Sequence, residues 1–390
     1  MSQATSESAT THRLASDGHV RLTDPIAWVA AELLGTAALG GDDPLSAPAL
    51  AMLAAGGLGF GSYRADDGRW WVSGRPHWHD DLALLRAVAP SLRPDLALER
   101  ALRNGDVLAA EERPRLCWIA ARTIEALGLP EADASAMPVV LLHAFSDIAA
   151  VRVLGRTIRL HRDRLIAALR PDAGDGCATF VANPPPAPRQ FVEGLRAVLE
   201  RCANQWALSR APSDGPAGWL DAARHLGAIA EQASDPAAGA DALLALLRAA
   251  GLERGDGALH RGLFADGLLE ASRLLQDHAV KDRALAFATH AGAVSAFRVG
   301  LLPVGPEAAT LWDAEDALAL AIVRGGHPDR VFLARERVRE ARDAARAHLV
   351  GLGVEAIAAR LEDAAIGLLG LLREERKLVQ SLAETVGGGA

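Results

Sequence analysis

The chain is poor in lysine, in cysteine and in aromatic residues, and each shortage excludes a class of function. Of its 41 Lys and Arg residues only Lys281 and Lys377 are lysine, so an enzyme that forms a Schiff base would have to use one of these two. No GxxxxGK[ST] motif is present, which excludes a P-loop nucleotide site. Aromatic residues make up 4%, β-branched residues are sparse, and alanine and leucine dominate the hydrophobic half of the chain. This composition is typical of a helical globular protein.

The few cysteines and the pattern of acidic residues and histidines argue against a metal centre. Cys117, Cys177 and Cys202 have long, irregular spacings that form neither a disulfide framework nor a zinc site, and they suit a reducing cytoplasm. Asp221 and His225 share a helix face, but a di-iron centre needs several such pairs, and the chain contains no Glu-x-x-His motif. We therefore expect no metal ligands.

Long apolar runs and excess positive charge are also missing. The longest segment without Asp, Glu, Lys or Arg, residues 44–63, contains two prolines and four glycines and is unsuited to a membrane helix. The formal net charge of −8 argues against a nucleic-acid or anionic-membrane partner. Residues 1–18 are rich in Ser and Thr and lack an apolar stretch, so we interpret them as a disordered arm. The sequence predicts a soluble, cytoplasmic protein.

The remaining residues predict a mainly α fold in two parts. Residues 19–183 have mixed patterns and predict an α/β N-terminal region that includes a β-hairpin. A stiff Pro-rich linker, residues 184–188, follows. Residues 189–390 predict an all-α helical bundle domain, because apolar residues recur there at helical spacing.

The β-hairpin is predicted from residues 63–72, YRADDGRWWV. An Asp-Gly pair between two short apolar segments is a strong signal for a two-residue type I′ turn. That turn would set Tyr63 opposite Val72 on the apolar face. Trp70 would share this face, so it should be more buried than Trp71.

Three other segments of the N-terminal region have patterns of different clarity. Residues 80–128 read as helical, with breaks at prolines. Residues 137–145, MPVVLLHAF, fit a short strand or the start of a helix, because periodicity does not separate the two. Residues 151–160, VRVLGRTIRL, fit either a second hairpin or two helices that meet at a glycine.

After the linker, every segment predicts a helix, and Gly, Pro or Asp-Gly separates most of them. The spacing is too uneven for a defined helical repeat. The expected helices span residues 189–206, 216–233, 236–250, 261–279, 281–299, 307–324, 328–350 and 353–385.

The last helix carries apolar residues at alternating spacings of three and four from Val354 to Leu382, interrupted only by Glu375. Such a heptad seam is typical of coiled coils. A helix of this length would extend roughly 45–50 Å, which exceeds a small bundle. We therefore expect Leu371, Leu378 and Leu382 to be covered by the chain's own helices or by a second copy, with a homodimer favoured.

His77 and His79 are candidate catalytic residues within residues 70–81, WWVSGRPHWHDD. If the strand continued, side chains two residues apart would share a face and present two imidazoles together. The alternative is structural, because Pro76 precedes them and Asp80 is suited to cap the next helix.

His290 is the third candidate, in the middle of residues 284–297, ALAFATHAGAVSAF, which contain no charged residue. A helix that is apolar all round is normally surrounded on every side, so we expect a central helix with a buried imidazole. A buried histidine acts as a general base, as a haem ligand or as a hydrogen-bonded core residue.

Two hypotheses about function remain open. The first is an enzyme that acts on a small organic substrate in a pocket between the two regions, with His77, His79 and His290 as catalytic candidates and its reaction and any cofactor unknown. The second is a non-catalytic helical scaffold or partner-binding protein that dimerises through its C-terminal helix. The Trp-rich hairpin and the 12 histidines favour the first, and the heptad seam favours the second.

Overall fold

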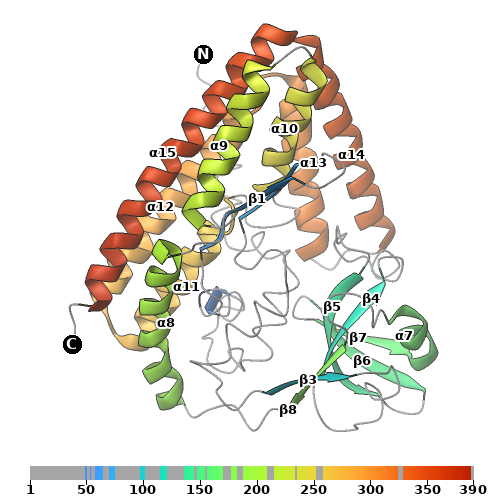
Figure 1. The fold of residues 1–390 in the computed structure, drawn as a ribbon. Coiled ribbons are helices and arrows are strands. Elements are labelled where there is room, and N and C mark those ends of the chain that lie inside the picture. Colours follow the sequence, from blue (N-terminus) through green and yellow to red (C-terminus); the bar gives the residue numbers. More distant parts are fainter. Residues whose placement is uncertain are drawn as a thin grey trace, which may run out of the picture.

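The fold is described from a computed structural model of the chain (Figure 1), in which a group of long helices and a separate antiparallel sheet are the main features. The predicted disordered arm, residues 1–18, lies outside the described residues. The structure describes residues 49–50, 53, 58–64, 70–74, 97–101, 115–120, 136–144, 147–153, 156–169, 177–181, 188–208, 215–232, 235–251, 258–323 and 328–387.

The N-terminal region contains more β-structure than the sequence predicts. A six-stranded sheet has the order β3-β8-β4-β5-β6-β7, and all its neighbouring strands are antiparallel. Its strands are β3 (Ala97–Ala101), β4 (Arg115–Ala120), β5 (Ala136–Ala144), β6 (Ile148–Val153), β7 (Arg156–His161) and β8 (Cys177–Val181), and a short helix, α7 (Arg162–Ala168), follows β7.

These strands resolve three sequence predictions. The segment 137–145 lies almost wholly in β5, and 151–160 forms a hairpin of β6 and β7. The prediction of helix over 80–128 is wrong where the structure describes that segment, because β3 and β4 lie within it. Both strands pair with β8, so hydrogen bonding to a strand far along the chain outweighs the local helical spacing of their leucines and alanines.

The predicted hairpin is present as β1 (Gly61–Arg64) and β2 (Trp70–Ser73), but its register is shifted by one residue. Tyr63 pairs with Trp71, not with Val72, and Tyr63 is exposed. A one-residue shift moves each side chain to the other face of the strand, so the predicted two-residue turn is wrong. Both tryptophans are partly buried, and Trp70 packs against the core and donates a hydrogen bond to Ser62.

The C-terminal part is helical throughout the described residues, as the sequence predicts. The predicted linker lies outside the described residues except for Pro188, which is the first residue of α8. The helices are α8 (Pro188–Leu208), α9 (Gly215–Glu231), α10 (Pro236–Ala249), α11 (Arg261–Leu275), α12 (His278–Gly300), α13 (Pro306–Val323), α14 (Pro328–Gly351) and α15 (Val354–Gly387).

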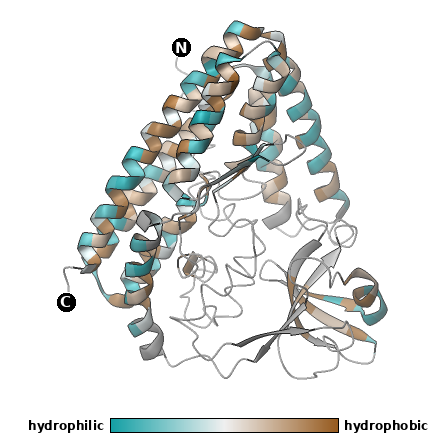
Figure 2. Cartoon of the chain, viewed as in Figure 1, coloured by the Kyte–Doolittle hydropathy of each residue, from teal (hydrophilic) through white to brown (hydrophobic). Residues whose placement is uncertain are grey.

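One core joins these helices to the hairpin. It includes Phe60 just before β1, Val72 in β2, Trp219 on α9 and Phe287 on α12. The helices alternate between hydrophilic and hydrophobic positions (Figure 2), as expected for helices that each bury one side. No described helix combines the length and the hydropathy that crossing a membrane requires.

The heptad seam of α15 is part of this core. Leu371 and Leu382 are buried, and Leu378 is partly buried and packs against the same cluster. The chain's own helices therefore cover the seam, as one of the two predicted alternatives requires, and this surface is not free to bind a second copy.

Helix α12 departs from its prediction. Phe287 and His290 are buried, but Leu285 is 54% exposed and Val299 is 46% exposed. The helix is therefore not surrounded on every side, although its sequence is apolar all round.

Candidate functional site

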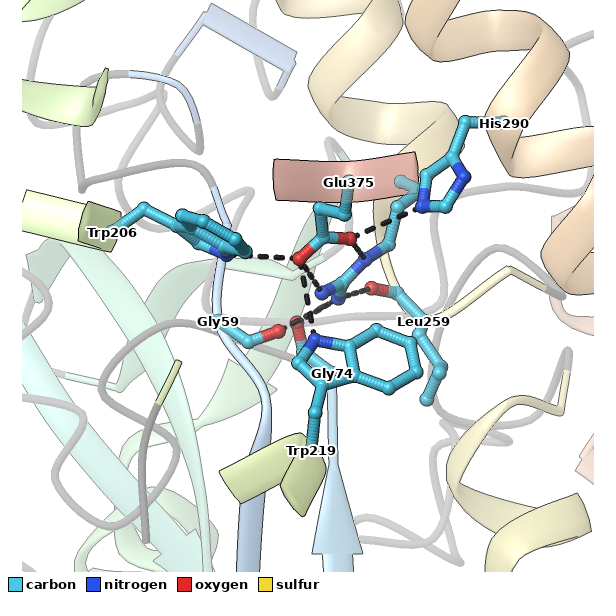
Figure 3. Close-up of polar contacts among 8 residues, drawn as sticks. Gly59, Gly74, Trp206, Trp219, Leu259, His290 and Glu375 are labelled. Atoms are coloured by element: carbon cyan, nitrogen blue, oxygen red, sulfur yellow. Dashed lines mark hydrogen bonds and ion pairs between the residues drawn. The ribbon is translucent and has the colours of Figure 1, made fainter. Parts of the chain in front are cut away.

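Among the residues that the structure describes, buried polar groups are most concentrated around Glu375 on α15, whose side chain is fully buried. Its Oε1 accepts hydrogen bonds from Trp206 Nε1 on α8, at 2.9 Å, and from Trp219 Nε1 on α9, at 3.3 Å. His290 on α12 lies 3.3 Å from Oε2 through its Nε2. Figure 3 shows these three rings pointing toward the carboxylate from different elements.

Arg261, the first residue of α11, makes the closest contacts with this carboxylate. Its Nε donates to Oε2 at 2.7 Å and its Nη2 donates to Oε1 at 2.8 Å, so the ion pair is bidentate. Its Nη1 donates to the backbone carbonyls of Gly59 at 2.7 Å, Leu259 at 2.6 Å and Gly74 at 3.2 Å. Since Gly59 precedes β1 and Gly74 follows β2, Arg261 joins both strands of the hairpin to α15. We call Glu375, Arg261, His290, Trp206 and Trp219 the Glu375 cluster.

Unusual backbone geometry precedes Arg261. Leu259 and His260 both have left-handed backbone conformations, with φ of 53° and 65°, which residues other than glycine rarely adopt. This turn brings Leu259 against the end of the hairpin. A Cβ added at Gly74 would lie 2.5 Å from the Leu259 carbonyl oxygen, so the approach requires glycine at this position.

The charge on Glu375 follows from its neighbours. Burial alone would raise the pKa of its carboxyl, but the Arg261 guanidinium and the hydrogen bond from His290 lower that pKa to about 2. The carboxylate is therefore ionised at neutral pH and only accepts hydrogen bonds. It follows that His290 carries a hydrogen on Nε2 and is the donor in its hydrogen bond to Glu375.

These contacts determine what the Glu375 cluster can do chemically. A carboxylate has about four lone-pair positions, and this one receives hydrogen bonds from Arg261, Trp206, Trp219 and His290. Its side chain and that of Arg261 have no exposed surface. The arrangement holds five helices (α8, α9, α11, α12 and α15) and the hairpin together, and it leaves the carboxylate no acceptor position for a substrate.

Of the candidate residues from the sequence, His290 belongs to this cluster, whereas His77 and His79 lie outside the described residues. The sequence offered one signal for Glu375, because it is the only charge in the apolar seam of α15. Sequence reasoning missed Arg261, which lies 114 residues away along the chain and follows no motif.

A second buried ionic cluster joins α12, α13 and α14. Glu315 is hydrogen-bonded to Arg298 and to Arg342, the latter at 3.3 Å, and the Arg298 guanidinium lies over the ring of Trp312 at 4.5 Å. Beside it, burial raises the pKa of Asp316 to about 6, although Arg298 opposes the shift. This cluster also links helices.

Neither cluster resembles a metal centre. Among the residues that the structure describes, no group of three or more His, Cys, Asp or Glu side chains is placed to hold a metal ion. Comparison of the chain with models of known protein families gave no match, and comparison with curated proteins gave no significant match.

Proposed function

We propose that the protein is a non-catalytic helical scaffold that binds a protein partner through the exposed side of α12. The observation that carries the proposal is a surface that we call the α12 face, and that lacks charged residues over more than four helical turns. Its members are exposed: Leu285, Ala288, Thr289, Gly292, Ala293, Ala296, Val299 and Gly300.

The composition of the α12 face supports binding of a protein. In a chain of which 23% of residues are charged, exposed helix faces normally carry charges. An uncharged face with exposed Leu and Val costs little to desolvate and is typical of protein interaction sites. The same helix directs His290 to the other side, into the Glu375 cluster.

The Glu375 cluster supports a scaffold for a different reason. Its titratable groups are closed off from solvent and hydrogen-bonded to one another, whereas catalytic groups have to reach a substrate. The enzyme hypothesis then depends on His77 and His79, which lie outside the described residues. An absorption spectrum of the purified protein from 300 to 700 nm tests it, because a haem or flavin band would favour the enzyme.

Site-specific photo-crosslinking in the cells that produce the protein tests the scaffold proposal. A benzophenone amino acid replaces Gly292 or Ala296 on the α12 face, and in a matched control it replaces Ala344, which is exposed on α14. We expect both α12 positions to give the same discrete adduct and the control to give none. The proposal fails if neither α12 position gives an adduct that the control lacks.

A further inference from the structure

We propose that the partner of the α12 face is a second copy of this chain, packed antiparallel around a two-fold axis at Gly292. This inference rests on the proposed function and identifies its partner. The first argument is the symmetry of the face. Ala288 and Ala296 lie four residues on either side of Gly292, and Leu285 and Val299 lie seven residues on either side.

That symmetry is what an antiparallel pair requires. Around a two-fold axis the same patch is used by both copies, so each position faces the position equally far beyond the centre. Gly292 then faces itself, Ala288 faces Ala296, and Leu285 faces Val299. Residues of similar size meet at these five positions, so this part of the face is self-complementary.

The five positions also form one strip. At 3.6 residues per turn they all fall within about 40° of Gly292 around the helix axis, and the strip from Leu285 to Val299 is about 21 Å long. Small residues at its centre allow the two helix axes to approach to about 8 Å. The larger side chains at its ends then cover the central contact from both sides.

Gly292 leaves room for close approach from outside. A Cβ added at Gly292 would meet nothing within 4 Å, so packing within the chain does not require glycine here. By contrast, a Cβ at Gly367 on α15 would lie 2.6 Å from the ring of Phe297, so that glycine is explained within the chain. Glycine in a helix interior lowers helix stability. The space beside Gly292, like that beside Gly227 and Gly370 on other helices, is open in the single chain, so a second backbone fits here.

Cysteine crosslinking of the purified full-length chain, with copper–phenanthroline and dioxygen as the oxidant, tests the axis. We expect Gly292→Cys alone to form a disulfide-linked dimer, because residue 292 faces itself. Leu285→Cys and Val299→Cys should each crosslink weakly alone but efficiently when the two proteins are mixed. The matched control is Ala344→Cys on α14, and equal crosslinking by this control overturns the proposal.

Light scattering of the full chain measures the dimer directly. The mass of one chain is 40.9 kDa, so we expect the wild type to have twice that mass. Gly292→Arg should lower the measured mass to that of one chain, whereas Ala344→Arg should leave the dimer mass unchanged. Circular dichroism shows whether each variant is folded, and Ala288→Glu serves as a second disrupting variant. A wild-type mass of one chain at all concentrations overturns the dimer. The scaffold proposal then survives only if the photo-crosslinked adduct contains a different chain.

Discussion

At the scale of single residues, the Glu375 cluster shows a buried charge that is tolerated because its hydrogen-bonding capacity is filled. Transfer of an unpaired carboxylate into the core would be strongly unfavourable, so Glu375 depends on Arg261. Arg261 depends equally on Glu375, because its own side chain is buried. Loss of both partners should therefore cost less than the sum of the two single losses.

This mutual dependence gives the first prediction. Arg261→Met or Glu375→Leu should each lower the free energy of unfolding by about 3–5 kcal/mol, since each leaves an uncompensated buried group. The double variant should lose less than the sum of the two. Urea denaturation followed by circular dichroism measures the three values, and additive losses would contradict the interpretation. Arg346→Met, which breaks an exposed ion pair with Asp241, is the control with little expected effect.

The low pKa of Glu375 gives a prediction about acid. Because the folded-state pKa of about 2 lies below the usual glutamate pKa of 4.5, the native state binds fewer protons than the unfolded state between these values. The stability that Glu375 contributes is present above about pH 4.5 and is lost as the pH falls toward 2. Melting temperatures from pH 7 to pH 2 should show a steeper acid decline in the wild type than in Glu375→Gln. Parallel curves would exclude this contribution.

Asp316 has the opposite effect on the pH dependence of stability. Its folded-state pKa of about 6 lies above the usual aspartate pKa of 3.8, so the native state binds more protons and loses stability as the pH rises from about 4 through 6. Asp316→Asn should therefore raise the free energy of unfolding at pH 7, by about 1 kcal/mol after allowance for solvent screening of this partly buried group. The variant and the wild type should converge near pH 4, and a constant difference across this range would contradict the assignment.

At the scale of elements, the spacing of apolar residues predicted those elements that depend on residues near one another in the sequence. The helices after Pro188 lie close to their predicted bounds, and the seam of α15 is buried as one predicted alternative required. Strands β3 and β4 were missed because β8, their partner, is far along the sequence. The hairpin shifted by one residue because its turn differs from the predicted two-residue type. The spacing of apolar residues identified His290 as a buried candidate and Glu375 as the charge that interrupts the seam. It gave no indication that either residue contacts Arg261.

Helical glycines give the element-scale prediction. Gly367→Ala should destabilise the chain, because its Cβ would meet the Phe297 ring between α12 and α15 at 2.6 Å. Gly292→Ala should instead stabilise the isolated chain by about 1 kcal/mol, the difference in helix propensity, because nothing lies within 4 Å of the added carbon. Urea denaturation at high dilution, where one chain is measured alone, compares the two variants. The same sign for both would contradict the packing described for these helices.

At the scale of the whole molecule, Arg261 joins segments from both ends of the described chain. Its contacts connect the carbonyls beside β1 and β2 to Glu375 on the last helix. A hairpin alone is at most marginally stable in water, so the stability of this one depends on the helices it contacts. The hairpin and the helices should therefore unfold as one cooperative unit.

Hydrogen exchange measured by mass spectrometry tests this coupling. In the wild type, the paired amides of residues 61–64 and 70–73 should be protected to a similar extent as those of residues 371–382, because both are released by the same opening. Arg261→Met removes the donors to Gly59 and Gly74, so the hairpin should open and exchange faster while α15 keeps more of its protection. Arg346→Met should leave both segments unchanged, because its ion pair is exposed. Fast exchange of the hairpin already in the wild type, or equal loss of protection in both segments of Arg261→Met, would show that Arg261 does not carry the coupling.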